Sequence, residues 1–305
     1  MKKIFLLILF SFCLFLPSVY AERTQHTEFL HIGTEDGLSN NSITSIVQDS
    51  LGFIWIGTKH GLNRYDGVNF KLYSSEQNNL QGNDISVLHI DRKNRFWTGT
   101  VGNGLFLYSP LNDSFEQILP DSASNPKSAY IEVHALLELD GQDDLLWIAT
   151  EAGLYSYSTT SKKTTHYRQK SEHGKNDIRA MAEAPDGRIW LGTFGYGLSV
   201  FNTKTLTFED FNNADFSGLT IHSDYINTLF ADKNGRLLAG TNENGLKLID
   251  FQKKKIIGYP AMANHNRHTI IRCIRQDRQG NLWIGTDGTG ILYVETSVEP
   301  VARNP

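Results

Sequence analysis

Six copies of one short motif, in which a tryptophan is followed two residues later by glycine and then by threonine, recur along the 305 residues of the chain. Ala149 replaces the glycine in the third copy and Leu238 replaces the tryptophan in the fifth. The anchors fall at a nearly constant spacing, at positions 55, 97, 147, 190, 238 and 283. A period of about 40 to 50 residues is typical of folds built from repeated sheets, each of which buries its apolar face against the next. The period therefore restricts the chain to a repeat architecture.

Each copy has the same surroundings, and these predict four short antiparallel strands. An apolar run such as Ile43–Ile46 precedes a turn former, the tryptophan strand follows, and a glycine such as Gly61 opens a third, alternating strand. A fourth strand carries aromatic residues, as in Phe70–Tyr73. Four strands per period predict an all-β fold, a β-propeller of six four-stranded blades.

The two ends of the repeat region predict how the ring closes. The last copy has a third strand over 291–295 but no fourth, whereas an unassigned strand, Glu28–Ile32, precedes the first copy. We expect this N-terminal strand to complete the sixth blade, which would remove two exposed sheet edges. The alternative is that the six copies belong to an incomplete seven-bladed ring.

The first 21 residues differ from the rest of the sequence. Two lysines precede an apolar run over 4–16, and the segment that follows ends in small residues at the alternate positions 19 and 21, which is the pattern of a secretory signal peptide. The run is shorter than the roughly 20 residues that span a bilayer. We therefore predict a signal peptide over 1–21, a propeller over 22–296, a tail over 297–305, and a periplasmic location after cleavage.

Charge and cysteine content exclude several classes of function. The formal net charge is -4, and the longest basic run, Lys253–Lys255, has three residues, so the sequence lacks the basic surface of a nucleic-acid-binding protein. Only Cys273 lies beyond the predicted signal peptide, which leaves no partner for an intramolecular disulfide. Because Cys273 falls in a predicted innermost strand, we expect a buried, unreactive thiol.

The repeated residues are predicted to carry the fold. An identical tryptophan in every blade is what packing between neighbouring blades requires, although tryptophan faces also stack on sugars in binding proteins. The glycine two residues later would leave room for the adjacent sheet. Four copies have an aspartate six residues before the anchor, which we expect to cap a turn through its backbone; these are Asp49, Asp91, Asp232 and Asp277.

Functional residues are expected where the copies differ but share a geometric position. The turn after the tryptophan strand and the segment before the innermost strand should meet at one end of the blades, around the mouth of the central channel. From these two sets we predict eight ligand-binding residues: His60, Asp84, Asn103, Glu151, Asp177, Tyr196, Glu243 and Asp287. The segments before the innermost strands also supply His134, His222, Asp224, Arg267 and His268. The alternative is that these residues are turn formers and solvated surface.

Amides, carboxylates, imidazoles and aromatic rings at such a mouth suit a polar ligand with many hydroxyl groups, such as an oligosaccharide. No catalytic residue, metal site or cofactor is predicted, because the histidines are dispersed and no Gly-x-Ser-x-Gly turn occurs. Carboxylates for glycoside chemistry could come from Glu151, Glu243 or Asp287, but the sequence gives no separation between them.

Taken whole, the segment Ile43–Thr58 with its continuation Gly61–Gly67 resembles the two-component regulator propeller repeat, and Glu35–Ser42 is similar to the segment that opens such domains. The resemblance covers roughly residues 28–295. It implies a periplasmic ligand-sensing domain of bacterial signalling proteins, in which the propeller is usually followed by a membrane span and a histidine kinase or a diguanylate cyclase. Many relatives respond to polysaccharide fragments.

Two departures from that family limit what the resemblance implies. Its rings commonly have seven blades, and no output module follows Pro305 in this sequence. We therefore expect a sensor propeller that signals through a partner, such as a membrane sensor kinase or a diguanylate cyclase, or through a missing module. The alternatives are an enzyme similar to streptogramin lyase, for which no matching His-Glu-His set is present, and a protein-interaction scaffold.

Overall fold

The computed structural model describes residues 30–119, 130–169, 175–211, 215–218, 221, 225–232, 234–259 and 269–295. The chain divides into two units, residues 1–32 and 33–305, and every sheet lies in the second. The predicted signal peptide and tail lie outside the described residues, as do the first two residues of the predicted closing strand.

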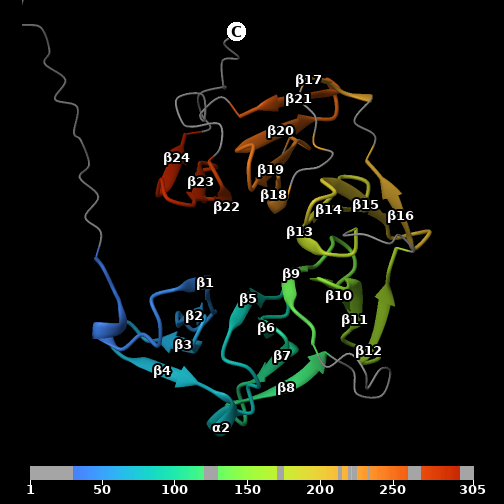
Figure 1. Cartoon of the computed structure of the whole chain (residues 1–305). Coiled ribbons are helices and arrows are strands. Elements are labelled where there is room, and N and C mark those ends of the chain that lie inside the picture. Colours follow the sequence, from blue (N-terminus) through green and yellow to red (C-terminus); the bar gives the residue numbers. More distant parts are fainter. Residues whose placement is uncertain are drawn as a thin grey trace, which may run out of the picture. The chain divides into compact units, whose positions relative to one another are not determined.

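Six sheets follow one another along the chain and surround a common centre, as Figure 1 shows. Blade 1 contains β1 (Ile43–Gln48), β2 (Ile54–Thr58), β3 (Gly61–Tyr65) and β4 (Phe70–Tyr73). Blade 2 contains β5 (Ile85–Ile90), β6 (Phe96–Thr100), β7 (Gly104–Ser109) and β8 (Ser114–Leu119). Blade 3 contains β9 (Val133–Leu137), β10 (Leu145–Thr150), β11 (Gly153–Ser158) and β12 (Lys163–Tyr167).

Blade 4 contains β13 (Ile178–Glu183), β14 (Ile189–Thr193), β15 (Leu198–Asn202) and β16 (Thr207–Asp210). Blade 5 contains β18 (Ile226–Ala231), β19 (Leu237–Thr241), β20 (Leu246–Asp250) and β21 (Lys255–Gly258), with the short β17 (Ser217–Gly218) added in parallel to β21. Blade 6 contains β22 (Ile271–Gln276), β23 (Leu282–Thr286) and β24 (Ile291–Val294). A 3₁₀ turn (Thr34–Asp36) and the four-residue helix α2 (Ser75–Asn78) are the helical segments of the described residues.

The predicted six-bladed β-propeller is confirmed. Within each blade the strands other than β17 pair antiparallel in chain order. The first strands of successive blades contact one another, so that β1, β5, β9, β13, β18 and β22 are innermost. The number of strands differs from the prediction in blade 5, which gains β17, and in blade 6, where the described residues form three strands.

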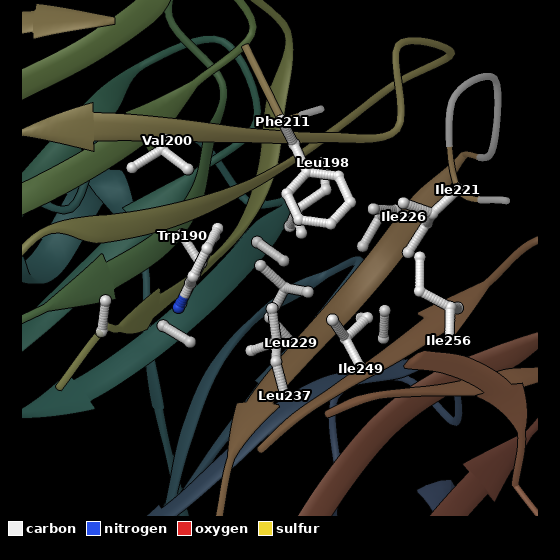
Figure 2. Close-up of a cluster of buried hydrophobic side chains, with 14 residues drawn as sticks. Trp190, Leu198, Val200, Phe211, Ile221, Ile226, Leu229, Leu237, Ile249 and Ile256 are labelled. Carbon is white, nitrogen blue, oxygen red and sulfur yellow. The ribbon is translucent and has the colours of Figure 1, made fainter. Parts of the chain in front are cut away.

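Successive blades are joined by an apolar side chain that enters a space beside glycine. A methyl group added to Gly99 of β6 would lie 2.9 Å from Cβ of Val133, the first residue of the innermost strand of blade 3. At Gly240 the same construction meets Ile271 of blade 6 at 2.6 Å. The glycine of the repeat is therefore needed for close approach of the next sheet, as its position predicted. Between blades 4 and 5, Figure 2 shows the cluster that results.

The repeated aspartate does more than the predicted turn capping. The Asp91 carboxylate accepts hydrogen bonds from the backbone N–H groups of Lys93 and Arg95, and its second oxygen accepts the indole N–H of Trp97 at 2.8 Å. The same indole bond joins Asp49 to Trp55, and Asp277 to Trp283. The aspartate thus locks the turn and orients the tryptophan that fills the junction.

The two ends of the blade series differ from every junction between them. The anchor side chains of blades 1 to 5 are at most 7% exposed, whereas Trp283 of blade 6 is 38% exposed. On the innermost strand of blade 1, Ile43 and Ile46 are 41% and 59% exposed, whereas Ile85 and Leu88, their equivalents in blade 2, are buried. The interpretation of the tryptophans as core residues is therefore confirmed for four of them and wrong for Trp283.

The expected closing strand is not found. Its described part, Leu30–Ile32, is not in a strand, and no described segment adds a fourth strand to blade 6. The exposed Trp283 face also explains a second correction, since Cys273 is exposed rather than buried. Its thiol lies against Gly285 on the side of blade 6 that no further described blade covers. The equivalent residues of blades 4 and 5, Ala180 and Thr228, are buried because the next sheet covers them.

Candidate functional site

The two sets of loops predicted to form the mouth do meet at one end of the blades, which we call the loop face. In five blades the first residue of the turn after the second strand donates its backbone N–H to a carbonyl just before the first strand. The pairs are Lys59 to Ser42, Val101 to Asp84, Phe194 to Asp177, Asn242 to Tyr225 and Asp287 to Ile270, at 2.9 to 3.2 Å. This bond fixes each turn beside the start of its innermost strand.

Blade 3 replaces the backbone bond with a side chain. The backbone N–H of Glu132, just before β9, donates to Oε2 of Glu151 in the turn after β10 at 2.7 Å. Burial is the largest influence on the Glu151 carboxyl and raises its pKa above the usual value. The loop face of blade 3 thus holds a carboxylate that is partly withdrawn from water.

A charged cluster connects blades 3 and 4 at this face. The imidazole of His134 on β9 lies between two carboxylates, with Nδ1 3.6 Å from Glu132 and Nε2 3.4 Å from Asp177. The guanidinium of Arg179 on β13 contacts both oxygens of Asp177, with Nε 2.7 Å from Oδ1 and Nη2 donating to Oδ2 at 2.9 Å. Glu132, His134, Asp177 and Arg179 therefore form one network across the blade boundary.

Aromatic rings extend the network toward blade 5. The guanidinium of Arg179 lies over the ring of Phe194 at 4.9 Å, and Phe194 packs against Tyr225 with ring centroids 4.5 Å apart. Phe194 and Tyr196 nevertheless remain 47% and 38% exposed. Large aromatic side chains held on a loop and open to solvent are typical of binding surfaces.

The electrostatics of Asp177 are set by its partners. Burial alone would raise the pKa of this carboxyl, but hydrogen bonds from His134 and Arg179 and their nearby charges outweigh burial and lower it. Asp177 is therefore a carboxylate throughout the neutral range. The pKa of Glu151 is shifted in the opposite direction, upward, by burial. The loop face thus contains two carboxyl groups in unlike environments.

The structure brings some of the eight predicted residues together and separates others. Asp177 belongs to the network around His134, and Glu151 adjoins it by accepting the backbone N–H of Glu132. Tyr196 lies in the adjacent turn of blade 4, with Nζ of Lys175 6.0 Å from its ring. On blade 2, Asp84 and Asn103 occupy the predicted segment and turn. The other three residues are exposed on their own turns, where Asp287 pairs with Arg272; these are His60, Glu243 and Asp287.

Four members of the network were missed as ligand-binding residues: Glu132, Arg179, Phe194 and Tyr225. The contact that brings them together across the blade boundary joins His134 to Asp177, two residues about one repeat apart in sequence. A signal was nevertheless available. Glu132 and His134 alternate along one strand as Asp177 and Arg179 do along the next, which places four polar groups on facing sides at the same height. His222, Asp224, Arg267 and His268 lie outside the described residues.

Glu151→Gln is expected to raise the free energy of unfolding at pH 7, by less than the roughly 1 kcal/mol that one pKa unit represents, because burial penalises the charged carboxylate and not the neutral amide. A carboxyl whose pKa is raised in the folded state stabilises most when protonated, so wild-type stability should fall as pH rises from about 4.5 through the folded-state pKa. Urea denaturation between pH 4 and 8 measures this slope. Glu243→Gln, on the exposed equivalent turn of blade 5, is the control and should change neither stability nor slope.

Two properties of the described part of the chain bear on the class of protein. None of its helices is long and apolar enough to cross a bilayer. It also contains no group of three or more histidine, cysteine, aspartate or glutamate side chains arranged to hold a metal ion.

Together, the six blades and the charged and aromatic loop face define a β-propeller with a candidate binding surface at one end. The model of the family described as two component regulator propeller matches residues 37–60, 174–195 and 267–288 of this chain. It is 29% identical over 207 residues to "Histidine kinase P4" of Formosa agariphila, a match that covers 64% of this chain and 15% of that protein.

Two solved structures are similar to this chain. The extracellular domain of the putative hybrid two component system BT3049 from B. thetaiotaomicron is 26% identical, with a TM-score of 0.52, over 87% of this chain and 41% of that one. Virginiamycin B lyase from Staphylococcus aureus has a TM-score of 0.61 at 15% identity, over 83% and 81% of the two chains, which is a likeness of fold alone. The chain spans less than half the length of the signalling relatives it matches.

Proposed function

We propose that this chain is a ligand-sensing propeller of bacterial two-component signalling, and that it binds an oligosaccharide or a similar polar molecule at the loop face of blades 3 to 5. The observation that carries the proposal is the coincidence of exposed aromatic rings with a fixed row of charged groups. Phe194 and Tyr196 offer faces for sugar rings, while Arg179, Asp177 and Glu151 offer donors and acceptors for hydroxyl groups.

The repeats and the sensor-domain relatives support the signalling context. We infer a periplasmic location, because the N-terminal sequence has the pattern of a secretory signal peptide and a similar solved structure is an extracellular domain. In this proposal a membrane sensor kinase or a diguanylate cyclase receives the signal. A bound ligand changes the activity of that partner only if it binds one conformational state of the propeller more tightly than another.

The binding proposal is tested with the chain and a library of oligosaccharides. A ligand that binds only the folded state raises the melting temperature, which identifies candidates for calorimetry. For such a ligand, Phe194→Ala and Tyr196→Ala are each expected to weaken binding about tenfold or more, because an exposed stacking face is lost. Leu111→Ala, which removes an exposed apolar side chain from the turn after β7, should leave the affinity unchanged. If neither aromatic substitution changes the affinity, the ligand binds elsewhere and the site assignment is wrong.

One observation favours a second candidate, a propeller enzyme. The loop face joins a carboxyl of raised pKa to a His–Asp–Arg network across two blades, which is an arrangement that acid–base chemistry can use. The candidate predicts that a bound oligosaccharide is converted to products at a rate that Glu151→Gln lowers at least about a hundredfold. Mass spectrometry of the ligand after incubation separates the two functions, since a sensor returns it unchanged.

A further inference from the structure

A cavity lies between blades 4 and 5 at the end of the strands opposite the loop face. It is about 510 Å³ in volume, within the range of small-molecule sites. The turn from β13 to β14 and the turn from β18 to β19 form its rim, and Trp190, Leu237 and Phe251 form its apolar wall. None of the residues that bind at the loop face in our proposal contributes to it.

The cavity contains one of the two positions where the repeat has lost its aspartate, the other being Gly141 of blade 3. In blades 1, 2 and 6 a carboxylate six residues before the tryptophan accepts the indole N–H, as Asp91 does from Trp97. In blade 4 that position is Ala184, which lines the cavity. Arg188, whose equivalent Arg95 pairs with Asp91, turns instead to Asp186 and Glu209. The place of one carboxylate is therefore open in blade 4.

Trp190 keeps the donor for which that carboxylate is the usual acceptor. Its side chain is 7% exposed, stacks on Phe251 with ring centroids 4.7 Å apart, and lines the cavity. No described residue accepts a hydrogen bond from its indole N–H. Figure 2 shows the nitrogen at the end of the ring that points away from Val200 and Phe211. The indole N–H is therefore open to the cavity, where a ligand can supply the acceptor.

The charges around the cavity specify the other half of such a ligand. Asp232 pairs with Arg236 at 2.7 Å, and Asp140 pairs with Arg92. Glu183 accepts the backbone N–H of Asp140 at 3.0 Å but forms no ion pair with any described residue. One uncompensated carboxylate therefore remains at the rim, which attracts a cation and repels an anion.

We propose that this cavity binds a cationic ligand whose ammonium or guanidinium group lies against Glu183 while a neutral oxygen accepts the indole N–H of Trp190. An arginine or lysine side chain beside its own carbonyl group has this chemistry, and so does an amino sugar. The site is separate from the proposed binding surface at the loop face, so either proposal can fail without the other.

The chain labelled with ¹⁵N at tryptophan tests the proposal through its five indole resonances. Trp190→Phe assigns the resonance of Trp190. Argininamide and glucosamine are the probes, and glucose and glucuronate are the neutral and anionic controls. We expect a saturable shift of the Trp190 resonance with at least one cationic probe at low salt, a weaker response at high salt, and none with either control. Argininamide alone would point to a basic side chain as the natural ligand, and glucosamine alone to an amino sugar.

Two variants separate the two halves of the site. Ala184→Asn supplies the missing acceptor without adding a charge, and is expected to weaken binding about tenfold or more by occupying the open position. Glu183→Gln should weaken it about fivefold and remove most of the salt dependence. Gly141→Asn, at the equivalent position of blade 3, is the matched control and should bind as wild type. The proposal is overturned if no cationic probe shifts the Trp190 resonance, or if Ala184→Asn and Glu183→Gln both bind like wild type.

Discussion

Replacing Trp97 with alanine is expected to lower the free energy of unfolding by about 3–5 kcal/mol, the cost of emptying a large buried aromatic site. Trp97 is fully buried between blades 2 and 3, where it packs with Leu105, Ile131 and Val133. Its ring also meets Tyr157 at 5.7 Å. The neighbouring sheets are fixed by their own hydrogen bonds, so they can close the cavity only in part.

Trp283→Ala removes the same residue from the same position of the repeat and provides the control. Because Trp283 is 38% exposed and lies in no buried cluster of the described residues, its loss should cost only about 1–2 kcal/mol. Equilibrium unfolding in urea measures both values. Equal losses for the two variants would show that the outer face of blade 6 is covered in solution.

Asp91→Ala is expected to lower the free energy of unfolding by about 2–4 kcal/mol, because it leaves several donors without their acceptor at once. The buried carboxylate holds the backbone N–H groups of Lys93 and Arg95, the Nε–H of Arg95 and the indole N–H of Trp97. The unpaired indole N–H should account for most of this cost, because Trp97 is enclosed between blades 2 and 3 and water cannot replace the lost acceptor.

The parallel change at the end of the series is Asp277→Ala. Asp277 accepts the backbone N–H groups of Gln279 and Asn281 and the indole N–H of Trp283, so the lost bonds are similar. Water can replace them at the exposed Trp283, and the cost should stay near 1 kcal/mol. The same urea measurements apply. If Asp91→Ala costs no more than Asp277→Ala, the indole bond contributes little in either blade.

Most of the fold could be predicted from the sequence because the residues that allow one sheet to pack against the next recur in six copies. Each copy contains the glycine beside the packed anchor, the apolar residue of the innermost strand and, in most copies, the aspartate at the turn. Because these copies recur at a regular period, the sequence predicts a ring of similar sheets. Ala149 and Leu238 show that single copies tolerate change. The repeat outweighs such departures.

The sequence could not predict the exposure and the contacts of side chains that depend on an adjacent blade, because that blade is distant in sequence or is not among the described segments. Ile46 reads as a core residue like Leu88, and Trp283 like Trp97, and only the arrangement of the sheets exposes them. The loop-face network has the same origin. Arg179 and His134 are ordinary strand residues in sequence, and they become partners because the blade boundary places Asp177 between them.

The sides of blades 1 and 6 that no described blade covers should determine how cooperatively this part of the chain unfolds. Interior blades are held from two sides, whereas the outer blades are held from one, as in a linear array whose stability is a sum of nearest-neighbour terms. Amide hydrogens of β22, β23 and β24 should then exchange by local opening well before those of blades 2 to 4. The exposed thiol of Cys273 lies at that edge, so its rate of alkylation would report the fraying of the last blade directly.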